Sequence, residues 1–165
     1  MSELNIPTIK RYRMESLYIE YDSDEYEQLF DIDKVDAITT LATTLIKSKM
    51  GELSISFVSS KRMKSLNKEF RNKEESTDIL SFVNEDDGFF SIEEEPILGD
   101  IVISLEDMLQ NCEYFGAQKD NELIRLIVHG LLHLNGHDHA SNEISEPMLQ
   151  LQEEIVKNIE KELGQ

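Results

Sequence analysis

Residues 121–135, NELIRLIVHGLLHLN, constrain the fold of this 165-residue chain more than any other stretch. The stretch is strongly apolar and its apolar residues recur with helical periodicity, which predicts a central helix. Gly136 comes just after the last apolar residue, Leu134, and a glycine there typically ends a helix by adopting a left-handed conformation. A chain of this length can bury one core without disulfides, so we expect a single domain over residues 1–165.

Periodicity elsewhere predicts the elements that surround this helix. Alternating apolar and polar residues predict half-buried strands at 16–21 and 52–59, and a third strand is expected at 77–83. The stretch 97–104 is more continuously apolar, which is typical of a strand buried on both faces. We therefore predict an α+β fold, with a mixed sheet of about four strands covered by helices. The expected helices span about 33–50, 60–71, 105–117, 119–135 and 145–163.

The remaining segments and the cysteine content indicate an ordinary cytoplasmic protein. The single cysteine, Cys112, excludes an internal disulfide framework and fits a reducing compartment, and we expect it in the core. No segment approaches the roughly 20 apolar residues that a membrane span needs. Residues 1–16 are interpreted as an N-terminal extension before the first strand, and residues 84–96 as an acidic loop.

All four histidines lie together in HGLLHLNGHDH, residues 129–139. Neutral imidazole is a common metal ligand, so this clustering indicates one site that uses several histidines. His129 and His133 are four residues apart on one face of the predicted helix, which lets both reach one ion about 2 Å from each nitrogen. Because Gly136 lets the chain reverse, His139 can reach the same ion.

Three neutral imidazoles with a free fourth position are typical of catalytic rather than structural zinc. We therefore expect one Zn²⁺ per chain at the C-terminal end of the central helix, where it would lower the pKa of a bound water toward neutrality. His137 is ambiguous, because it lies four residues after His133 but beyond the helix-breaking Gly136. It is either a fourth ligand or a group that supports the ligands or the substrate. The alternative for the whole cluster is a set of ordinary surface or core histidines.

The pattern differs from that of metalloproteases at one position. In the H-E-x-x-H motif the glutamate after the first histidine is the general base, and a longer form continues through a glycine to a third histidine. Here Gly130 follows His129, so that base is missing. A metallopeptidase-like hydrolase remains an alternative, with Asp138 as a base or as a group that orients a histidine.

Three segments resemble, in the same order, the signatures of one family. HGLLHLNGHDH resembles the H-G-x-L-H-L-x-G-Y-D-H signature of the YbeY endoribonucleases, also called rRNA maturation factors. Residues 66–82 resemble that family's L-N-x-x-y-R…T-D-V-L-S-F segment, and residues 98–104 resemble its L-G-D-I-x-I-S segment. The resemblance covers about residues 50–155, and it departs from the family at His137, where the family usually has tyrosine.

This resemblance implies a zinc-dependent, single-strand-specific endoribonuclease that acts in ribosomal RNA maturation and ribosome quality control. It implies that His129, His133 and His139 are the zinc ligands and that Arg71 is a functional, catalytic residue. The expected partners are single-stranded or ribosomal RNA, with ribosomal subunit proteins as further candidates and no membrane. The alternative outside enzymology is a ribosome-assembly module with a structural zinc, which a closed site with His137 as fourth ligand would favour.

Physical chemistry gives Arg71 a role of its own in such a reaction. A guanidinium can grip a phosphate bidentately and offset the charge that develops in phosphoryl transfer. The alternative is a surface arginine paired with one of the many acids. Asp78 and Asp100 either hold ligand histidines through their free N–H groups or cap the backbone beside their strands.

The charge of the chain argues against tight nucleic-acid binding. It has 34 acidic and 16 basic residues, a formal net charge of −18, and such a surface repels polyanions on average. A local basic cleft, or positioning by ribosome-bound partners, would offset this repulsion. The basic residues considered for such a cleft are Lys61, Arg62, Lys64, Arg71 and Arg125.

Overall fold

The computed structural model describes residues 9–48, 51–83 and 97–164, and it has the predicted α+β class. The expected acidic loop at 84–96 lies outside the described residues. Among the described residues no helix is long and apolar enough to cross a membrane. The strands are β1 (Lys10–Met14), β2 (Leu17–Tyr21), β3 (Glu52–Val58), β4 (Ile79–Val83) and β5 (Ile97–Ser104). The helices are α1 (Asp24–Leu29), α2 (Ile32–Ile46), α3 (Ser60–Arg71), α4 (Leu105–Phe115), α5 (Lys119–Leu134) and α6 (Pro147–Glu162).

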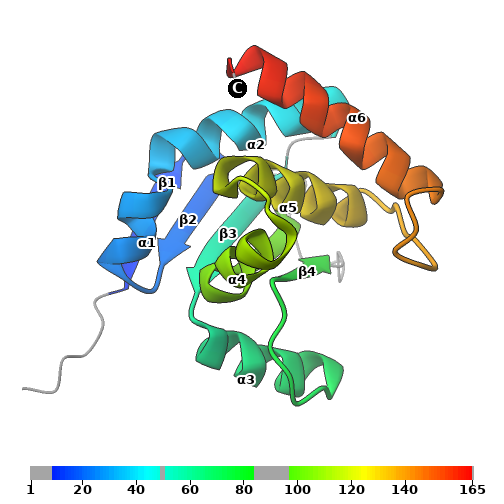
Figure 1. Ribbon diagram of the computed structural model, residues 1–165. Coiled ribbons are helices and arrows are strands. Elements are labelled where there is room, and N and C mark those ends of the chain that lie inside the picture. The colour runs from blue at the N-terminus through cyan, green and yellow to red at the C-terminus, as the bar shows by residue number, and fades with distance from the viewer. Residues whose placement is uncertain (1–8, 49–50, 84–96, 165) are drawn as a thin grey trace, which may run out of the picture.

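The strands form one mixed sheet in the order β1-β2-β3-β5-β4. The three inner strands, β2, β3 and β5, are parallel to one another, and β1 and β4 pair antiparallel at the two edges. Figure 1 shows α2, α5 and α6 together beside the sheet, with α3 at the opposite end of the molecule. As predicted for a strand buried on both faces, Ile101, Val102 and Ile103 of β5 are all buried.

The first strand, β1, is the element that the sequence pattern missed. Residues 10–14 were expected in an N-terminal extension, and the structure instead pairs them with β2. Only Tyr12 and Met14 pack against the core, while the outward positions carry charges, and Arg11 pairs with Glu20 across the strands. Charged edge strands of this kind avoid unwanted pairing, but their weak alternation hides them from a hydrophobicity pattern.

The start and end of α2 also differ from the predicted helix. The structure begins the helix after Asp31, whose Oδ1 accepts a hydrogen bond from the Lys34 backbone N–H at 2.9 Å. The helix ends at Ile46, with Lys47 in a left-handed conformation, and does not continue to Gly51. The N-terminal end was misplaced because several acids in that stretch are possible caps, and the C-terminal end is set by the left-handed Lys47 and not by a glycine.

The main core lies between one face of the sheet and the helices α2, α5 and α6, with α4 at its margin. Helix α5 is central, because it contacts α2, α4 and α6 as well as β4 and β5. Gly130 allows this helix to approach the sheet closely, since a Cβ atom there would lie 2.8 Å from Ile101 Cδ1. A smaller apolar cluster under α3 covers part of the other sheet face, and Cys112 of α4 is buried as predicted. The buried residues of α5 are Leu123, Ile124, Leu126, Ile127, Val128, Gly130, Leu131, Leu132 and Leu134.

Candidate metal centre

The end of α5 brings the histidine segment back toward the helix. Gly136 is left-handed, with a φ of 89°. The Gly136 N–H donates to the His133 carbonyl at 3.0 Å, and the His137 N–H donates to the Leu132 carbonyl at 3.0 Å. This pair of hydrogen bonds is the Schellman motif, and it satisfies two of the last carbonyl groups of the helix. The predicted reversal at Gly136 is therefore present.

The reversal gathers His129, His133 and His139 into one cluster. One ring nitrogen from each histidine lies within 4.8 Å of the others, and these three form the one such group among the described residues. The Nε2 atoms of His129 and His133 are 3.0 Å apart. All three side chains are partly buried, whereas His137 is exposed and is not a member of the group.

The other ring nitrogen of each clustered histidine is held by the protein. In every case Nδ1 meets an oxygen that can only accept a hydrogen bond, so Nδ1 carries the proton and Nε2 keeps its lone pair. The acceptors are Gln152 Oε1 for His129 at 2.7 Å, the His137 carbonyl for His133 at 3.1 Å and the Ser141 carbonyl for His139 at 2.9 Å. Partners of this kind orient metal-ligating histidines in many proteins.

This arrangement fits a bound cation. Two Nε2 lone pairs that face each other at 3.0 Å repel, unless a positive charge lies between them. Tetrahedral coordination with bonds of about 2.0–2.1 Å separates two ligand nitrogens by roughly 3.3 Å, close to the distance observed. Burial lowers the pKa of His129 and of His133, which favours the neutral form that binds metal. The cluster can therefore hold a metal ion.

Two hollows open on either side of the cluster. The first, which we call the Arg125 hollow, has a volume of about 370 Å³ and is lined by His129 and His139 together with Asp78, Arg125 and Gln152, among others. The second, the Arg71 hollow, has a volume of about 440 Å³ and is lined by Arg71, Ser81, Val83, His133, Gly136, His137 and Asp138. The histidines thus sit between two surface depressions, and a ligand in either one can reach the cluster.

The structure brings Arg71 to the site and leaves most of the other basic candidates elsewhere. Arg71 is the last residue of α3, is exposed, and shares its hollow with His133. Lys61 and Arg62 line a different hollow between α1 and α3, where Arg62 pairs with Glu20 and Asp22. Lys64 lines neither hollow beside the histidines.

Arg125 lies near the cluster, but its charge is already compensated. Its Nε donates to Glu153 Oε1 at 2.7 Å and its Nη1 donates to Glu122 Oε2 at 2.8 Å, while Nη2 donates to Glu153 as well. This proximity lowers the pKa of Glu153 below its usual range. Of the basic residues considered for a cleft, only Arg71 and Arg125 therefore lie beside the histidines, and the charge of Arg125 is neutralised.

Neither acidic residue considered as a histidine partner holds a ligand histidine. Asp78 lines the Arg125 hollow, where burial raises its pKa and its Oδ2 accepts from Asn111 Nδ2 at 3.3 Å. Asp100 accepts a hydrogen bond from the Ser54 hydroxyl on β3. The side chain that does hold a histidine is Gln152 of α6.

Gln152 was missed because the histidine motif does not contain it. It is 6% exposed and is the one polar member of the buried stripe of α6. A glutamine within an otherwise apolar stripe is the signal that could have found it, because a buried amide needs a hydrogen-bond partner. The other members of the stripe are Met148, Ile155, Val156 and Ile159.

The geometry explains why the protease base is absent. Gly130 occupies the position of the metalloprotease glutamate, and it faces Ile101 in the core and not the histidine cluster. Any side chain here would collide with the sheet. The site therefore contains histidines that can hold a metal ion, in the spacing of a protease, without room for the proteolytic carboxylate.

Comparisons with known proteins agree with these features. The family model described as endoribonuclease YbeY matches residues 12–160. The chain belongs to the YbeY family. The resemblance seen in the sequence is thereby confirmed, and it extends further toward the N-terminus than the motifs alone indicate.

Individual YbeY relatives match over most of their length. The endoribonuclease YbeY of Listeria monocytogenes serotype 4b is 37% identical, with 81% of this chain and 90% of the relative covered. The endoribonuclease YbeY of Treponema denticola is 37% identical, with 84% and 92% covered. The solution structure of TM1509 from Thermotoga maritima shares the fold, with a TM-score of 0.57 and 22% identity over 80% of this chain and 85% of that chain.

Proposed function

We propose that this chain is a zinc-dependent endoribonuclease that cleaves single-stranded RNA in ribosomal RNA maturation and ribosome quality control. The observation that carries the proposal is the convergence of one ring nitrogen from each of three histidines between two hollows, one of which is lined by Arg71. The names of the YbeY relatives support the reaction type. We take residues 1–165 to act as one cytoplasmic hydrolase domain.

Each side chain of the site has a part in this proposal. His129, His133 and His139 hold one Zn²⁺ through Nε2, with Nδ1 of each anchored as described. When bound, zinc supplies Lewis acidity toward a phosphodiester oxygen and lowers the pKa of a water at its open position. Arg71, the catalytic residue of the chain itself, grips the phosphate from the adjacent hollow and offsets the negative charge of the transition state.

The negative net charge of the protein affects how it binds RNA. With a formal charge of −18, the chain cannot rely on long-range attraction to phosphates. Binding then depends on contacts near the site and on ribosomal subunit proteins that bring substrate and enzyme together. Weak intrinsic affinity for RNA is consistent with a substrate delivered within a ribosomal particle.

Metal content and RNA cleavage test the proposal together. Purified protein should contain one zinc per chain by elemental analysis and should cleave single-stranded RNA, and a chelator should abolish cleavage. His139→Ala should lose both metal and cleavage, whereas the matched variant His137→Ala should keep both. If His139→Ala retains metal as well as His137→Ala does, the ligand assignment is wrong. Metal-loaded protein that cleaves no RNA would refute the nuclease and favour a structural zinc.

A further inference from the structure

The C-terminal turn of α4 exposes two aromatic side chains. Tyr114 and Phe115 are 82% and 75% exposed, more than any other large apolar side chain among the described residues. Their ring centroids are 4.8 Å apart and the ring planes stand at 83° to each other. Leaving this much aromatic surface in water forgoes hydrophobic stabilisation, and adjacent exposed aromatics of this kind mark sites of interaction.

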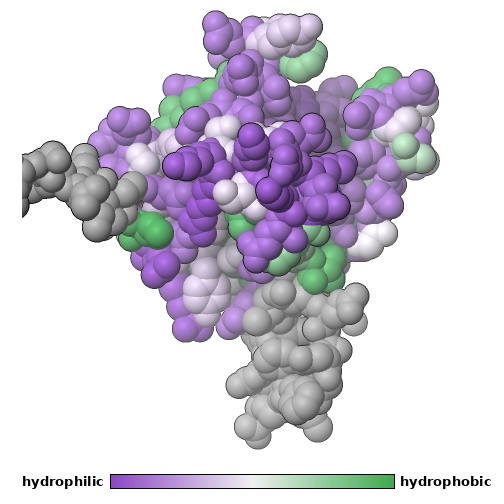
Figure 2. All heavy atoms as spheres, turned by 90° about the horizontal axis from the view of Figure 1, so that it is seen from below, coloured by the Kyte–Doolittle hydropathy of each residue, from purple (hydrophilic) through white to green (hydrophobic). Residues whose placement is uncertain are grey.

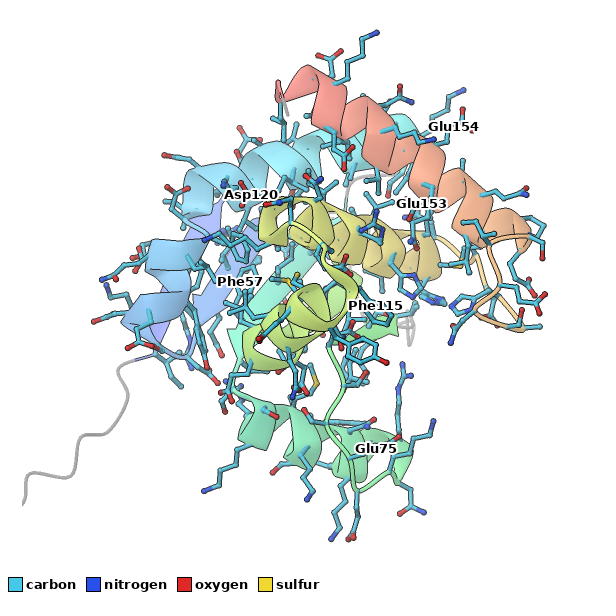
Figure 3. All side chains as sticks on the ribbon, viewed as in Figure 1. Phe57, Glu75, Phe115, Asp120, Glu153 and Glu154 are labelled. Atoms are coloured by element: carbon cyan, nitrogen blue, oxygen red, sulfur yellow. The ribbon has the colours of Figure 1, made fainter. Side chains whose placement is uncertain are left out.

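The aromatic pair lies next to the proposed active site. Phe115 follows Asn111 by one helical turn on the same flank of α4, and Asn111 Nδ2 donates to Asp78, which lines the Arg125 hollow with His129. Figure 3 shows Phe115 on the flank of α4 that lies below α5, the helix that ends in the histidines. An RNA strand that leaves the histidine cluster through the Arg125 hollow past Asp78 therefore runs toward the flank of α4 that carries Phe115.

The charges around the site indicate what the rings bind. Arg125 and Arg62 are neutralised by acids, so little positive charge remains near the histidines to attract phosphates, apart from Arg71. Figure 2 shows that the face carrying α3 is largely hydrophilic, so apolar contact there comes from small patches. In an acidic RNA-binding protein, stacking on bases is the contact that does not depend on attracting phosphates.

We propose that Tyr114 and Phe115 form a stacking platform for unpaired bases of the RNA substrate and contribute to its selection for single strands. Bases in a duplex have both faces covered by their neighbours, so only unpaired bases can stack on the two rings. The inference rests on the proposed function, since it assigns the substrate contact of that same site. It concerns substrate binding alone, because neither ring is among the residues that line the two hollows beside the histidines.

The central test compares two variants with changes in exposed apolar side chains of the same helix. Tyr114→Leu/Phe115→Leu keeps apolar bulk but removes the aromatic faces. Leu109→Ala truncates another exposed apolar residue of α4, which lies roughly a third of a turn away from Phe115. Affinity is measured with metal-loaded protein and a fluorescein-labelled single-stranded RNA by anisotropy, with the integrity of the RNA checked on a gel.

We expect Tyr114→Leu/Phe115→Leu to weaken binding about tenfold, the order of magnitude for a lost base-stacking contact. KM for RNA cleavage should rise by a similar factor, with kcat and zinc content unchanged, and Leu109→Ala should match the parent. An RNA with abasic sites should bind parent and double variant equally weakly. The conservative Tyr114→Phe should bind RNA like the parent.

Three results would overturn the platform. The first is that the double leucine variant binds the RNA as tightly as the parent does. The second is that it loses affinity equally for intact and abasic RNA. The third is that only Leu109→Ala weakens binding. If the double leucine variant binds RNA as the parent does, Tyr114 and Phe115 instead contact a protein partner, for which leucine is an adequate substitute. Because binding is measured apart from cleavage, a protein that binds RNA through the rings but never cleaves it would refute the nuclease and keep the platform.

Discussion

The two hollows beside the histidines each contain an arginine, and the two arginines differ in their surroundings. Arg125 is held by Glu122 and Glu153, and its hollow also contains the buried Gln152 that supports His129. Arg71 is exposed at the end of α3 and makes no ion pair among the described residues, and its hollow contains His133. One arginine is compensated by its own protein, and the other is available to a ligand.

This difference predicts a structural role for Arg125 and a functional one for Arg71. A guanidinium with two carboxylates in contact has few donors left for a phosphate and would have to break existing bonds to bind one. An exposed guanidinium that makes no ion pair can offer its planar set of N–H donors to a phosphate without breaking other bonds. We therefore expect Arg71 to bind the phosphate at which the RNA is cleaved. The Arg125 side chain has a supporting role, in a hollow through which the RNA strand leaves toward the aromatic rings.

The largest effect should come from reversing the charge in the Arg71 hollow. Arg71→Glu turns attraction for a phosphate into repulsion, and we expect cleavage of single-stranded RNA to fall by about a hundredfold or more. Arg71→Lys keeps the charge but loses the bidentate fork, so its activity should be intermediate. Cleavage rates at matched zinc content measure both effects.

The control for Arg71 is a charge reversal on the same helix. Lys68→Glu changes the net charge equally, but Lys68 pairs with Glu74 and lines neither hollow. The Lys68→Glu variant should cleave RNA at a rate within about twofold of the parent rate. If Lys68→Glu and Arg71→Glu lose the same activity, the effect is general electrostatics and Arg71 has no special place.

The next effect tests support within the Arg125 hollow. Gln152→Leu removes the acceptor for His129 Nδ1 in a nearly isosteric way, and we expect zinc affinity to fall by about 10- to 100-fold. Gln152→Glu retains an acceptor and should bind zinc close to the parent level. Competition with a chromophoric chelator measures the affinity. Equal zinc affinities for Gln152→Leu and the parent would mean that His129 needs no anchor.

A smaller effect should follow from removing the compensated arginine. Arg125→Gln leaves Glu122 and Glu153 close together without their cation, and we expect a loss of about 1–2 kcal/mol in unfolding free energy. RNA cleavage should stay within about twofold of the parent. Urea denaturation measures the stability, and a large loss of cleavage with unchanged stability would reverse the roles of the two hollows.

The stability loss of Arg125→Gln should depend on pH. Arg125 lowers the pKa of Glu153, so this ion pair stabilises the folded state above the usual glutamate pKa. As pH falls through the lowered pKa of Glu153, the carboxylate is protonated and the stabilisation is lost. The unfolding free energies of the parent and Arg125→Gln should therefore differ most near neutral pH and become similar in acid.

The same contrast explains what the sequence could and could not predict. The histidine cluster was predictable because its geometry is local: one helix, one glycine turn and fixed spacing bring His129, His133 and His139 together. Arg71 entered the argument through the family resemblance, because nothing local distinguishes it from other basic residues of α3. The contacts of His129 with Gln152 and of Arg125 with Glu153 depend on how α6 packs against α5, which is a long-range contact that periodicity does not specify. The edge strand β1 was missed because its outward face is charged.

The smallest effect is expected at His137, in the Arg71 hollow. Its side chain is exposed and lies outside the histidine cluster, while its backbone carbonyl accepts from His133 Nδ1. A change of side chain leaves that carbonyl in place, because the Gly136 turn and the His137 N–H bond to Leu132 fix the backbone. His137→Tyr should therefore keep zinc content and cleavage rate within about twofold of the parent. His137→Pro removes the N–H that closes the turn, so it should lose zinc affinity although it alters no clustered imidazole. If His137→Tyr also loses zinc, the side chain and not the backbone supports the site, and a closed, structural zinc site becomes the better description.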